Sequence, residues 1–331
     1  MNPKRIIISR TDAIGDVVLT LPLAVSLKQR FQDCTILFLG RNYTSAVVQC
    51  CPAVDEFVSW DEMSDNPAES LRKLNADVII HVFPRKEIAK AAHSAGIPIR
   101  IGTSHRTFHW FSCNRKINFS RKNSDLHEAQ LNFKLLEGLG ISEVPSMEEL
   151  NAMLLMSPKG ALRADLNELL DSGKINLILH PGSRGSAREW GMDRFAELIQ
   201  LLPTDRFKIF LTGTEKEGAM FRSELAEPFS QVTDLSGKLS LNELMVFISR
   251  CHALVAGSTG PLHLASALGI HAAGLYPPIR PMHPGRWSPI GKSFKVFVAD
   301  KECSACRKTA QCACMREISA AAVAEFLMGL G

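Results

Sequence analysis

Three short segments bring reactive side chains to points where an apolar strand is expected to end and a helix to begin. They are residues 10–16 (RTDAIGD), 180–190 (HPGSRGSAREW) and 257–263 (GSTGPLH). Backbone N–H groups at such glycine-bearing turns bind anions, phosphate above all. Because one segment opens the chain and two lie in its second half, we expect two α/β domains that face each other across a cleft. That arrangement suits a reaction between two bound molecules, one of them carrying phosphate.

Asp16 follows the glycine of the first segment and is expected at or just inside a helix N-terminus. One interpretation is a helix N-cap, which accepts a backbone hydrogen bond. The other is an ionised carboxylate at the edge of the cleft, which takes a proton from an attacking hydroxyl group. Asp12 flanks the same loop.

The second segment combines a hydroxyl group with two cations. Gly182 allows close backbone approach, Ser183 supplies the hydroxyl group, and Arg184 and Arg188 supply positive charge. One interpretation is a site for phosphate or pyrophosphate. The other is an ordinary loop with solvated arginines. Trp190 is expected to pack rather than to contact a ligand.

The third segment is expected to begin a helix. Thr259 is placed to cap that helix and Pro261 to occupy its first turn, so its N-terminus offers a second set of N–H donors to an anion. His263 lies in the same turn. It is either a core histidine or a hydrogen-bond partner of a phosphate or sugar hydroxyl group.

Residues 81–124 carry nine cationic side chains against one carboxylate, Glu87, whereas the whole chain has a net charge of +4. This basic stretch is either a solvated face or a docking surface for phosphorylated lipid, acidic sugar, anionic membrane or nucleic acid. Phe108, Trp110 and Phe111 lie in its middle. The nine cations are Arg85, Lys86, Lys90, Arg100, Arg106, Arg115, Lys116, Arg121 and Lys122.

Four of the nine cysteines cluster near the C-terminus with the spacing C-x2-C-x5-C-x-C. Four thiolates so close together can hold zinc. The alternative is a set of reduced or disulfide-prone thiols, since the spacing is cramped for a zinc knuckle and neighbouring cations stabilise thiolates without a metal. The four are Cys303, Cys306, Cys312 and Cys314.

Alternating strands and helices must position these residues. Strands are expected at 6–8, 35–39, 77–82, 99–102, 175–180, 207–211, 253–256, 272–276 and 294–298. Helices are expected at 17–30, 126–140, 193–202, 241–249, 260–268 and 319–330. This alternation is typical of a parallel, doubly wound sheet. The polar segment 141–173 is expected to contain the linker between two such sheets.

Composition narrows the class of protein. A chain of 331 residues with 46% hydrophobic and 22% charged residues is typical of a soluble protein with two cores. The sequence has no run of 18 apolar residues, so no membrane-spanning helix is predicted. The basic N-terminus precedes only three isoleucines, too few for a signal peptide, so we expect a cytoplasmic protein.

In their order and spacing, these features resemble glycosyltransferase family 9, the heptosyltransferases of lipopolysaccharide core synthesis. The resemblance runs over nearly the whole chain. It rests on the Gly15-Asp16 loop, on His127 and Glu128 ahead of Leu139 and Gly140, on the loop 181–183 with Trp190, on residues 258–267, and on the cysteine cluster that ends at Cys314 and Met315.

The resemblance implies an α/β fold of GT-B type, with two Rossmann-like domains and a cleft between them. Residues 1–155 would form the acceptor-binding domain, 156–174 the linker and 175–315 the domain that binds the nucleotide sugar. Residues 316–331 would form a C-terminal helix that packs back toward the first domain.

The resemblance also assigns roles. Asp16 matches the proposed general base, Ser183 a hydroxyl group near the phosphates, and Glu217 a nucleoside contact. Thr259, Gly260 and His263 match the phosphate-binding turn. Two positions differ from the family pattern: Arg188 stands where some members have lysine, and Ser258 where aspartate is frequent in heptosyltransferases. That aspartate contacts the donor sugar, so Ser258 leaves the sugar open.

We therefore expect an inverting glycosyltransferase that moves a heptose from ADP-heptose to the lipid A-linked inner core of lipopolysaccharide, with no cofactor and no metal. Arg115, Lys116, Arg121 and Lys122 would bind the anionic lipid-linked acceptor, with peripheral contact to the inner membrane. One alternative is a family 9 transferase that uses another nucleotide sugar or glycan acceptor. The other is a nucleotide-sugar-binding protein of GT-B fold without catalytic activity. Nucleic acid is not an expected partner, because the basic stretch lies in an α/β domain and contains no nucleic-acid motif.

Overall fold

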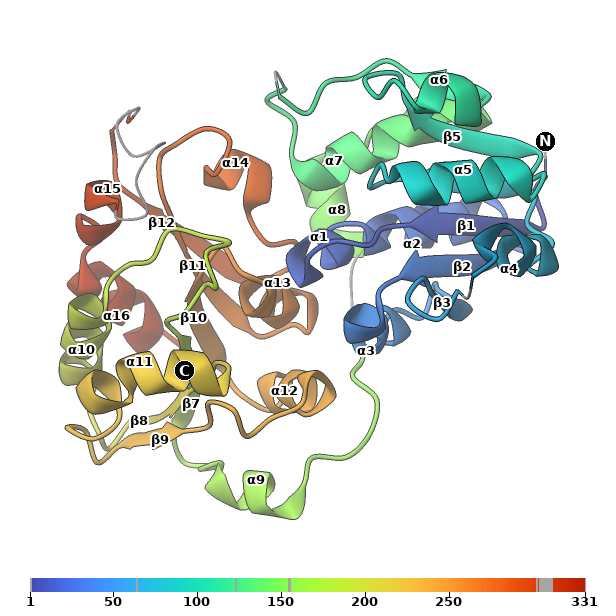
Figure 1. The fold of residues 1–331 in the computed structure, drawn as a ribbon. Coiled ribbons are helices and arrows are strands. Elements are labelled where there is room, and N and C mark those ends of the chain that lie inside the picture. Colours follow the sequence, from blue (N-terminus) through green and yellow to red (C-terminus); the bar gives the residue numbers. More distant parts are fainter. Residues whose placement is uncertain are drawn as a thin grey trace. The chain divides into compact units, whose positions relative to one another are not determined.

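The computed structural model describes residues 2–63, 65–122, 124–153, 156–301, 303 and 312–330 (Figure 1). The chain divides into two compact units, Met1–Ser157 and Pro158–Gly331. Each unit contains a parallel six-stranded sheet with helices on both faces, so the predicted doubly wound sheets are confirmed.

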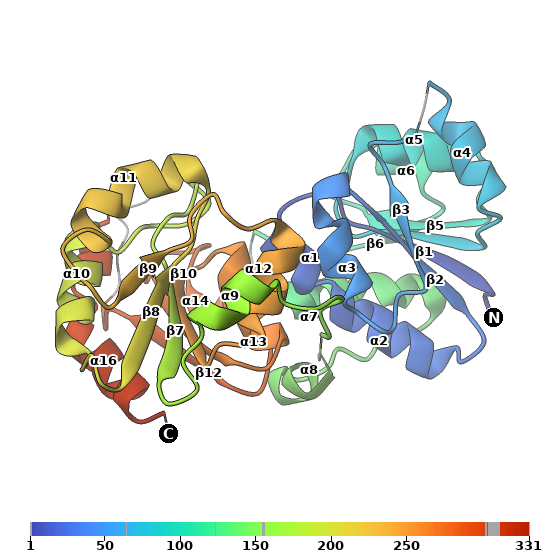
Figure 2. The same ribbon diagram turned by 90° about the horizontal axis from the view of Figure 1, so that it is seen from below.

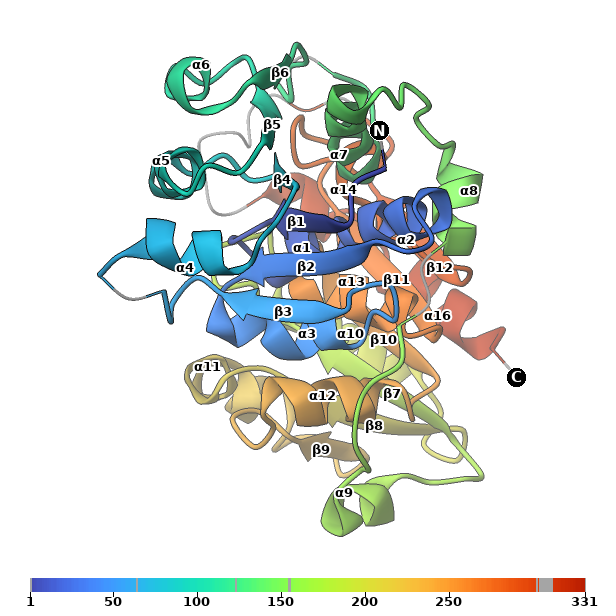
Figure 3. The same cartoon turned by 90° about the vertical axis from the view of Figure 1, so that its right-hand side faces the viewer.

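The first sheet has the strand order β3-β2-β1-β4-β5-β6, and Figure 3 shows the strands stacked in this order. Its central strands are buried on both faces, as parallel strands covered by helices must be. Ile6, Ile7 and Ile8 of β1, for example, are fully buried. The strands are β1 (Arg5–Ser9), β2 (Thr35–Gly40), β3 (Glu56–Ser59), β4 (Val78–His81), β5 (Ile99–Thr103) and β6 (Arg115–Ile117).

Helices α4 and α5 cover one face of this sheet, and α2 and α7 cover the other (Figure 2). The helix expected at 17–30 is interrupted after Val18 and restarts at Leu21, because the ring of Pro22 fits only the first turn of a helix. The helices are α1 (Ile14–Val18), α2 (Leu21–Arg30), α3 (Ser45–Gln49), α4 (Pro67–Lys73), α5 (Lys86–Ser94), α6 (His109–Ser112), α7 (Glu128–Phe133) and α8 (Met147–Met153), with 3₁₀ turns at Asn42–Thr44 and Lys134–Leu139.

The second sheet has the order β12-β11-β10-β7-β8-β9. Its strands are β7 (Ile175–His180), β8 (Phe207–Leu211), β9 (Val232–Asp234), β10 (Ala253–Gly257), β11 (His271–Tyr276) and β12 (Phe294–Val298). Its helices are α9 (Ala164–Leu169), α10 (Met192–Leu201), α11 (Glu215–Leu225), α12 (Leu241–Ile248), α13 (Gly260–Ala267), α14 (Pro284–Trp287), α15 (Ala313–Arg316) and α16 (Ala320–Met328). No helix among the described residues is both long and apolar enough to cross a membrane.

The units meet in sequence between Ser157 and Pro158. Helix α9 therefore belongs to the second unit, although it lies inside the segment 156–174 that we expected as linker. Helix α16 packs on α10, and Val323 and Leu327 are buried in the core of the second unit. The expected packing of residues 316–331 toward the first domain stays a prediction.

Candidate functional site

The first candidate loop leaves β1 and enters α1. Ala13 is the N-cap of α1, and Asp16 lies in the first turn. The interpretation of Asp16 as a helix N-cap is therefore wrong. Its side chain is 20% exposed, so it faces a partly open space at the carboxyl end of the sheet.

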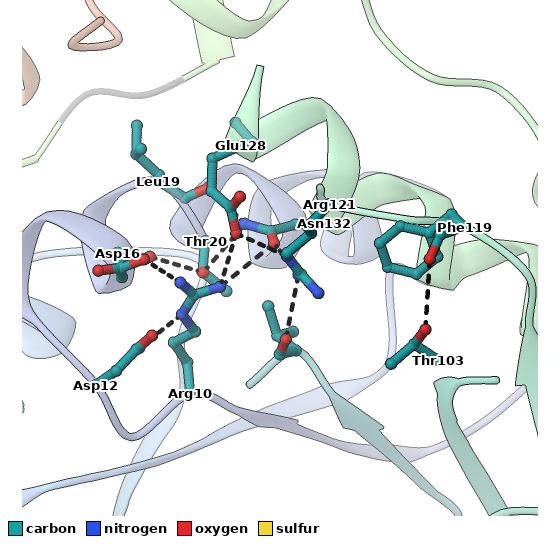
Figure 4. Close-up of polar contacts among 12 residues, drawn as sticks. Arg10, Asp12, Asp16, Leu19, Thr20, Thr103, Phe119, Arg121, Glu128 and Asn132 are labelled. Carbon is teal, nitrogen blue, oxygen red and sulfur yellow. Dashed lines mark hydrogen bonds and ion pairs between the residues drawn. The ribbon is translucent and has the colours of Figure 1, made fainter. Parts of the chain in front are cut away.

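Arg10 holds this loop together, and Figure 4 shows its contacts. Its Nε donates to Asp12 Oδ1 over 2.7 Å, and its Nη2 pairs with Asp16. Its Nη1 lies 3.3 Å from Glu128 Oε1 and 3.5 Å from Asn132 Oδ1. With only 3% of its side chain exposed, Arg10 is a buried cation whose three N–H edges each face an oxygen.

The environment of Asp16 favours proton uptake near neutral pH. Burial raises the pKa of Asp16 to about 6, while the charge of Arg10 opposes the rise and Asp12 and Glu128 add to it. Burial also raises the pKa of Asp12. A carboxylate whose pKa lies close to the working pH is an effective general base, because it is ionised at rest and still has affinity for a proton.

A second layer of polar groups supports Arg10 from the loop before α7 and from α7 itself. Arg121 Nε donates to Glu128 Oε1 over 3.0 Å, and Arg121 Nη2 donates to Asn132 Oδ1 over 3.0 Å. Asn132 Nδ2 in turn donates to the Leu19 carbonyl over 3.1 Å. The predicted acceptor-binding residue Arg121 thus contacts the two α7 side chains that face Arg10, and neither Arg10 nor Asn132 was predicted from the sequence to have a role here.

The other predicted acceptor-binding residues lie on the surface. Arg115 and Lys122 are exposed. Lys116 is exposed as well, and its Nζ lies 5.5 Å from the ring centroid of Trp110. Trp110 and Phe111 on α6 are 60% and 85% exposed. An exposed indole ring thus lies beside an exposed cation, with a second exposed ring next to it on α6.

In the second unit, the loop after β7 is folded on itself. Ser183 is buried, and its Oγ donates to Glu189 Oε1 over 2.8 Å. Arg188 is half-buried in the same loop. Trp190 is buried and donates from Nε1 to the Ile318 carbonyl over 3.0 Å, so its packing role is confirmed.

Glu217 connects this loop to the N-terminus of α11. Its Oε2 accepts from Thr214 N over 2.8 Å, and Thr214 Oγ1 accepts from Glu217 N, which makes a capping box. The other oxygen, Oε1, is buried and has no hydrogen-bond partner among the described residues. A buried carboxylate oxygen without a partner is costly, so Oε1 is an acceptor available to a ligand.

A pocket of about 450 Å³ lies next to Glu217, within the size range of small-molecule sites. Gly182, Thr214 and Met220 are among the residues that line it. His180 is buried nearby and its Nδ1 lies 3.0 Å from Thr212 Oγ1. Burial lowers the pKa of His180 to about 4 although Glu217 opposes this, so the imidazole is neutral at pH 7.

The turn between β10 and α13 carries the remaining predicted donor residues. Thr259 is the N-cap of α13, but it forms no side-chain cap. Its buried Oγ1 has no hydrogen-bond partner in the described part of the chain. Gly260 begins the helix, and His263 is buried in its first turn. Ser258 hydrogen-bonds with the side chain of Tyr276.

The cysteine cluster is only partly described, because Cys306 lies outside the described residues. Cys312 and Cys314 are buried, and no described cysteine forms a disulfide. The described residues also contain no group of three or more metal-ligating side chains. The two alternatives for Cys303, Cys306, Cys312 and Cys314, a zinc site or a set of thiols without a metal, both stay open.

Comparison with known proteins gives one family. The sequence model of glycosyltransferase family 9 (heptosyltransferase) matches residues 67–315, three quarters of the chain. The lipopolysaccharide core heptosyltransferase OpsX of Haemophilus influenzae is 20% identical over 308 residues, which are 89% of this chain and 85% of that protein.

Solved structures show the same fold. A family 9 glycosyltransferase from Veillonella parvula has a TM-score of 0.80 at 21% identity and covers 99% of this chain and 97% of its own. The Escherichia coli ADP-heptose lipopolysaccharide heptosyltransferase II has a TM-score of 0.77 at 20% identity, covering 99% and 98%. The E. coli heptosyltransferase WaaC with ADP has a TM-score of 0.71 at 18% identity, covering 99% and 100%. The expected GT-B fold, with two Rossmann-like domains, is confirmed.

Proposed function

Since this chain belongs to glycosyltransferase family 9, the heptosyltransferase family, we propose that it transfers a heptose from ADP-heptose to the lipid A-linked inner core of lipopolysaccharide. The observation that carries the proposal is the partly exposed carboxylate of Asp16, held by Arg10 beside the carboxyl end of the first sheet. Two of the similar structures support ADP as the nucleotide of the donor. One is the ADP-heptose heptosyltransferase II of E. coli, and the other is WaaC with ADP.

In the proposed reaction, Asp16 takes the proton of an acceptor hydroxyl group as its oxygen attacks the anomeric carbon of the donor. The bond between that carbon and the diphosphate oxygen breaks, and ADP leaves with the electron pair. Attack from the face opposite the leaving group inverts the anomeric centre. No metal is required in this scheme, because N–H groups and cations of the protein stabilise the diphosphate.

The donor residues divide by chemistry. One set supplies hydroxyl, cationic and helix N-terminal groups, which suit the diphosphate. This set consists of Ser183, Arg188, Thr259, Gly260 and His263. Glu217 Oε1 is a buried acceptor without a hydrogen-bond partner among the described residues, and Glu217 lines the pocket of about 450 Å³ to which we assign the nucleoside. A carboxylate in this position binds the hydroxyl or amino donors of ribose or base.

Ser258 supports a second candidate, a family 9 transferase that uses another nucleotide sugar. Its hydroxyl group is engaged with Tyr276 and carries no charge. A site that contacts a sugar hydroxyl group through a neutral serine favours a different donor sugar from a site that uses a charged aspartate.

A donor screen tests the proposed function. We expect ADP-heptose to raise the melting temperature and to support turnover with a lipid A-linked inner-core acceptor. UDP-, GDP- and dTDP-sugars serve as the comparison. Turnover with one of these and none with ADP-heptose would replace the proposal by the second candidate. Binding of a donor without turnover on any acceptor would indicate a silent nucleotide-sugar-binding protein.

Gly182→Ala should weaken ADP binding about tenfold. A Cβ at this position would lie 2.5 Å from Glu217 Oε1, and Glu217 cannot move away without opening the capping box of α11. Calorimetric titration with ADP measures the effect. Gly173→Ala is the control, because its Cβ would meet only Asp171, at 3.4 Å. Unchanged ADP affinity in Gly182→Ala would place the nucleotide outside this pocket.

Acceptor binding is expected at the exposed cations of the first unit. Replacing Arg115, Lys116 and Lys122 by glutamine should raise the KM for the anionic acceptor and flatten its rise with ionic strength, with the donor KM nearly unchanged. Arg121 is left intact because it supports the Asp16 loop. A control triple variant removes the exposed charges of Arg30, Lys73 and Lys159. Equal salt dependence in both variants would mean that the basic stretch is a solvated face.

We further propose that α6 touches the inner face of the inner membrane, where a lipid-linked acceptor resides. Aromatic side chains beside a cation are typical of membrane-interface contacts. Phe111→Ser should reduce binding to vesicles of phosphatidylglycerol about tenfold, the effect of withdrawing one phenyl ring from an apolar contact. Met220→Ser, at a residue of the second unit that is 61% exposed, is the control. Equal vesicle binding by all three proteins would contradict the contact.

A further inference from the structure

We propose that Glu128 is a positioning residue that acts on Asp16 through the guanidinium group of Arg10, with Arg121 as its counter-charge. The inference rests on the proposed role of Asp16 as the base. It assigns a function to Glu128, a buried carboxylate that contacts Arg10 through Nη1, whereas Asp16 pairs with Nη2. We call the five charged residues the arginine–carboxylate cluster: Arg10, Asp12, Asp16, Arg121 and Glu128.

Of the two cations of the cluster, Arg10 pairs with Asp16, and Arg121 pairs with Glu128. A guanidinium group has three N–H edges in one plane, and each edge of Arg10 is directed at a different carboxylate. Because the group is planar and 97% buried, its orientation is fixed by all three partners together. Glu128 thus determines where Nη2 presents its proton to Asp16.

Glu128 is itself held by two cations. Its side chain is 1% exposed, and its Oε1 receives Arg10 Nη1 at 3.3 Å and Arg121 Nε at 3.0 Å. Asn132 Oδ1 repeats this bridge, receiving the same Nη1 at 3.5 Å and Arg121 Nη2 at 3.0 Å (Figure 4). Two parallel bridges make the spacing between the guanidinium groups rigid.

The charges of the cluster do not balance. Three carboxylates face two guanidinium groups, so one formal negative charge remains. Glu128 lies between the two cations, whereas Asp12 and Asp16 are 21% and 20% exposed. A proton that neutralises the excess charge therefore goes to one of these two outer carboxylates, and Asp16 is the one expected to meet the acceptor hydroxyl group.

Other groups around Asp16 are few among the described residues. Tyr43 donates its hydroxyl to the Asp12 carbonyl, and burial raises the pKa of this hydroxyl group, with the charges of Asp12 and Asp16 adding to the rise. Thr20 Oγ1 donates to the Asp16 carbonyl over 2.8 Å. Asn132 Nδ2 lies 3.3 Å from that same Oγ1, so the second layer also holds the backbone of Asp16.

Replacing Glu128 and replacing Arg121 should change the proton affinity of the Asp16 carboxylate in opposite directions. Glu128→Gln keeps the size of the side chain and an oxygen that accepts from both arginines, but it removes the excess negative charge. Asp16 then loses affinity for a proton. Arg121→Gln leaves two excess negative charges, and Asp16 gains affinity. The second effect is smaller, because Glu128 lies between Arg121 and Arg10.

Carbon-13 NMR titration of aspartate carboxyl groups in the intact, ligand-free protein tests this. The Asp16 signal is the one missing in Asp16→Asn. We expect Glu128→Gln to lower its titration midpoint by about one pH unit, a tenfold loss of proton affinity, and Arg121→Gln to raise it by less. Glu87→Gln is the charge-matched control on the exposed start of α5 and should leave the midpoint unchanged.

Two results would overturn the inference: a midpoint that stays constant in both variants, or shifts of the same sign in both. If Glu128→Gln does not fold, as judged by circular dichroism, a midpoint that does not rise in Arg121→Gln still overturns it. The acidic limb of kcat/KM should move with the NMR midpoint. If the midpoints shift as expected and no transfer occurs on any donor, the proposed function fails and the electrostatic role of Glu128 stands.

Discussion

Asp16→Asn is expected to slow sugar transfer by roughly 10²–10⁴-fold, the usual contribution of a positioned general base. The amide nearly preserves the shape of the carboxylate and still accepts from Arg10 Nη2, so the loop keeps its conformation. ADP affinity should change little, because the residues proposed for the donor belong to the second unit. Single-turnover kinetics at saturating donor measures the step directly.

Asp12→Asn is the matched control for this prediction. Asp12 pairs with the same guanidinium group and is exposed to the same extent, 21% against 20%. If Asp16 is the base, Asp12→Asn should retain at least a tenth of the wild-type rate. The wild-type kcat/KM should fall as the pH is lowered through about 6, because Asp16 becomes protonated. A kcat within a few-fold of wild type in Asp16→Asn would end its assignment as the base.

Arg10→Met should destabilise the first unit by about 3–5 kcal/mol, the range for breaking a buried ion pair from one side. Methionine fills much of the space, but Glu128 and Asn132 lose a buried donor. Urea unfolding followed by hydrogen exchange and mass spectrometry reports each unit separately.

Arg72→Met is the comparison for this variant. Arg72 pairs with Glu69 on α4, and its side chain is 54% exposed. Exposed pairs contribute at most about 1 kcal/mol. If Arg10→Met lowers the free energy of unfolding no more than Arg72→Met does, solvent screens the charges of the cluster. The structural basis for a fixed Asp16 side chain would then be lost.

The central strands of both sheets were predictable because each is a run of apolar residues with a glycine or polar loop after it. The edge strands β3, β6 and β9 were not. They have three or four residues each, among them charged residues such as Glu56, Lys116 and Asp234, so none of them forms an apolar run. Their pairing comes from the neighbouring strand rather than from their own pattern.

The site was predictable to a similar degree. Glycine and hydroxyl residues after strands indicated the three loops, and Asp16 followed from its position in one of them. Arg10 and Asn132 were missed because their contacts join segments about 120 residues apart in sequence. Periodicity and spacing report local structure, whereas such a contact depends on which strand ends the sheet topology brings together. A basic residue directly after a buried strand, as at Arg10, is the sequence signal for such a contact.

Glu217 has a consequence for inhibitor design. One of its oxygens accepts from the Thr214 N–H at the start of α11, and the other lies buried against Gly182, which lines the same pocket as Glu217. A resistance substitution at Glu217 would also remove its half of the capping box, the acceptor of the Thr214 N–H, at a cost of about 1 kcal/mol in stability. Under the proposed function, a compound that donates a hydrogen bond to this oxygen contacts a residue whose replacement also weakens the start of α11.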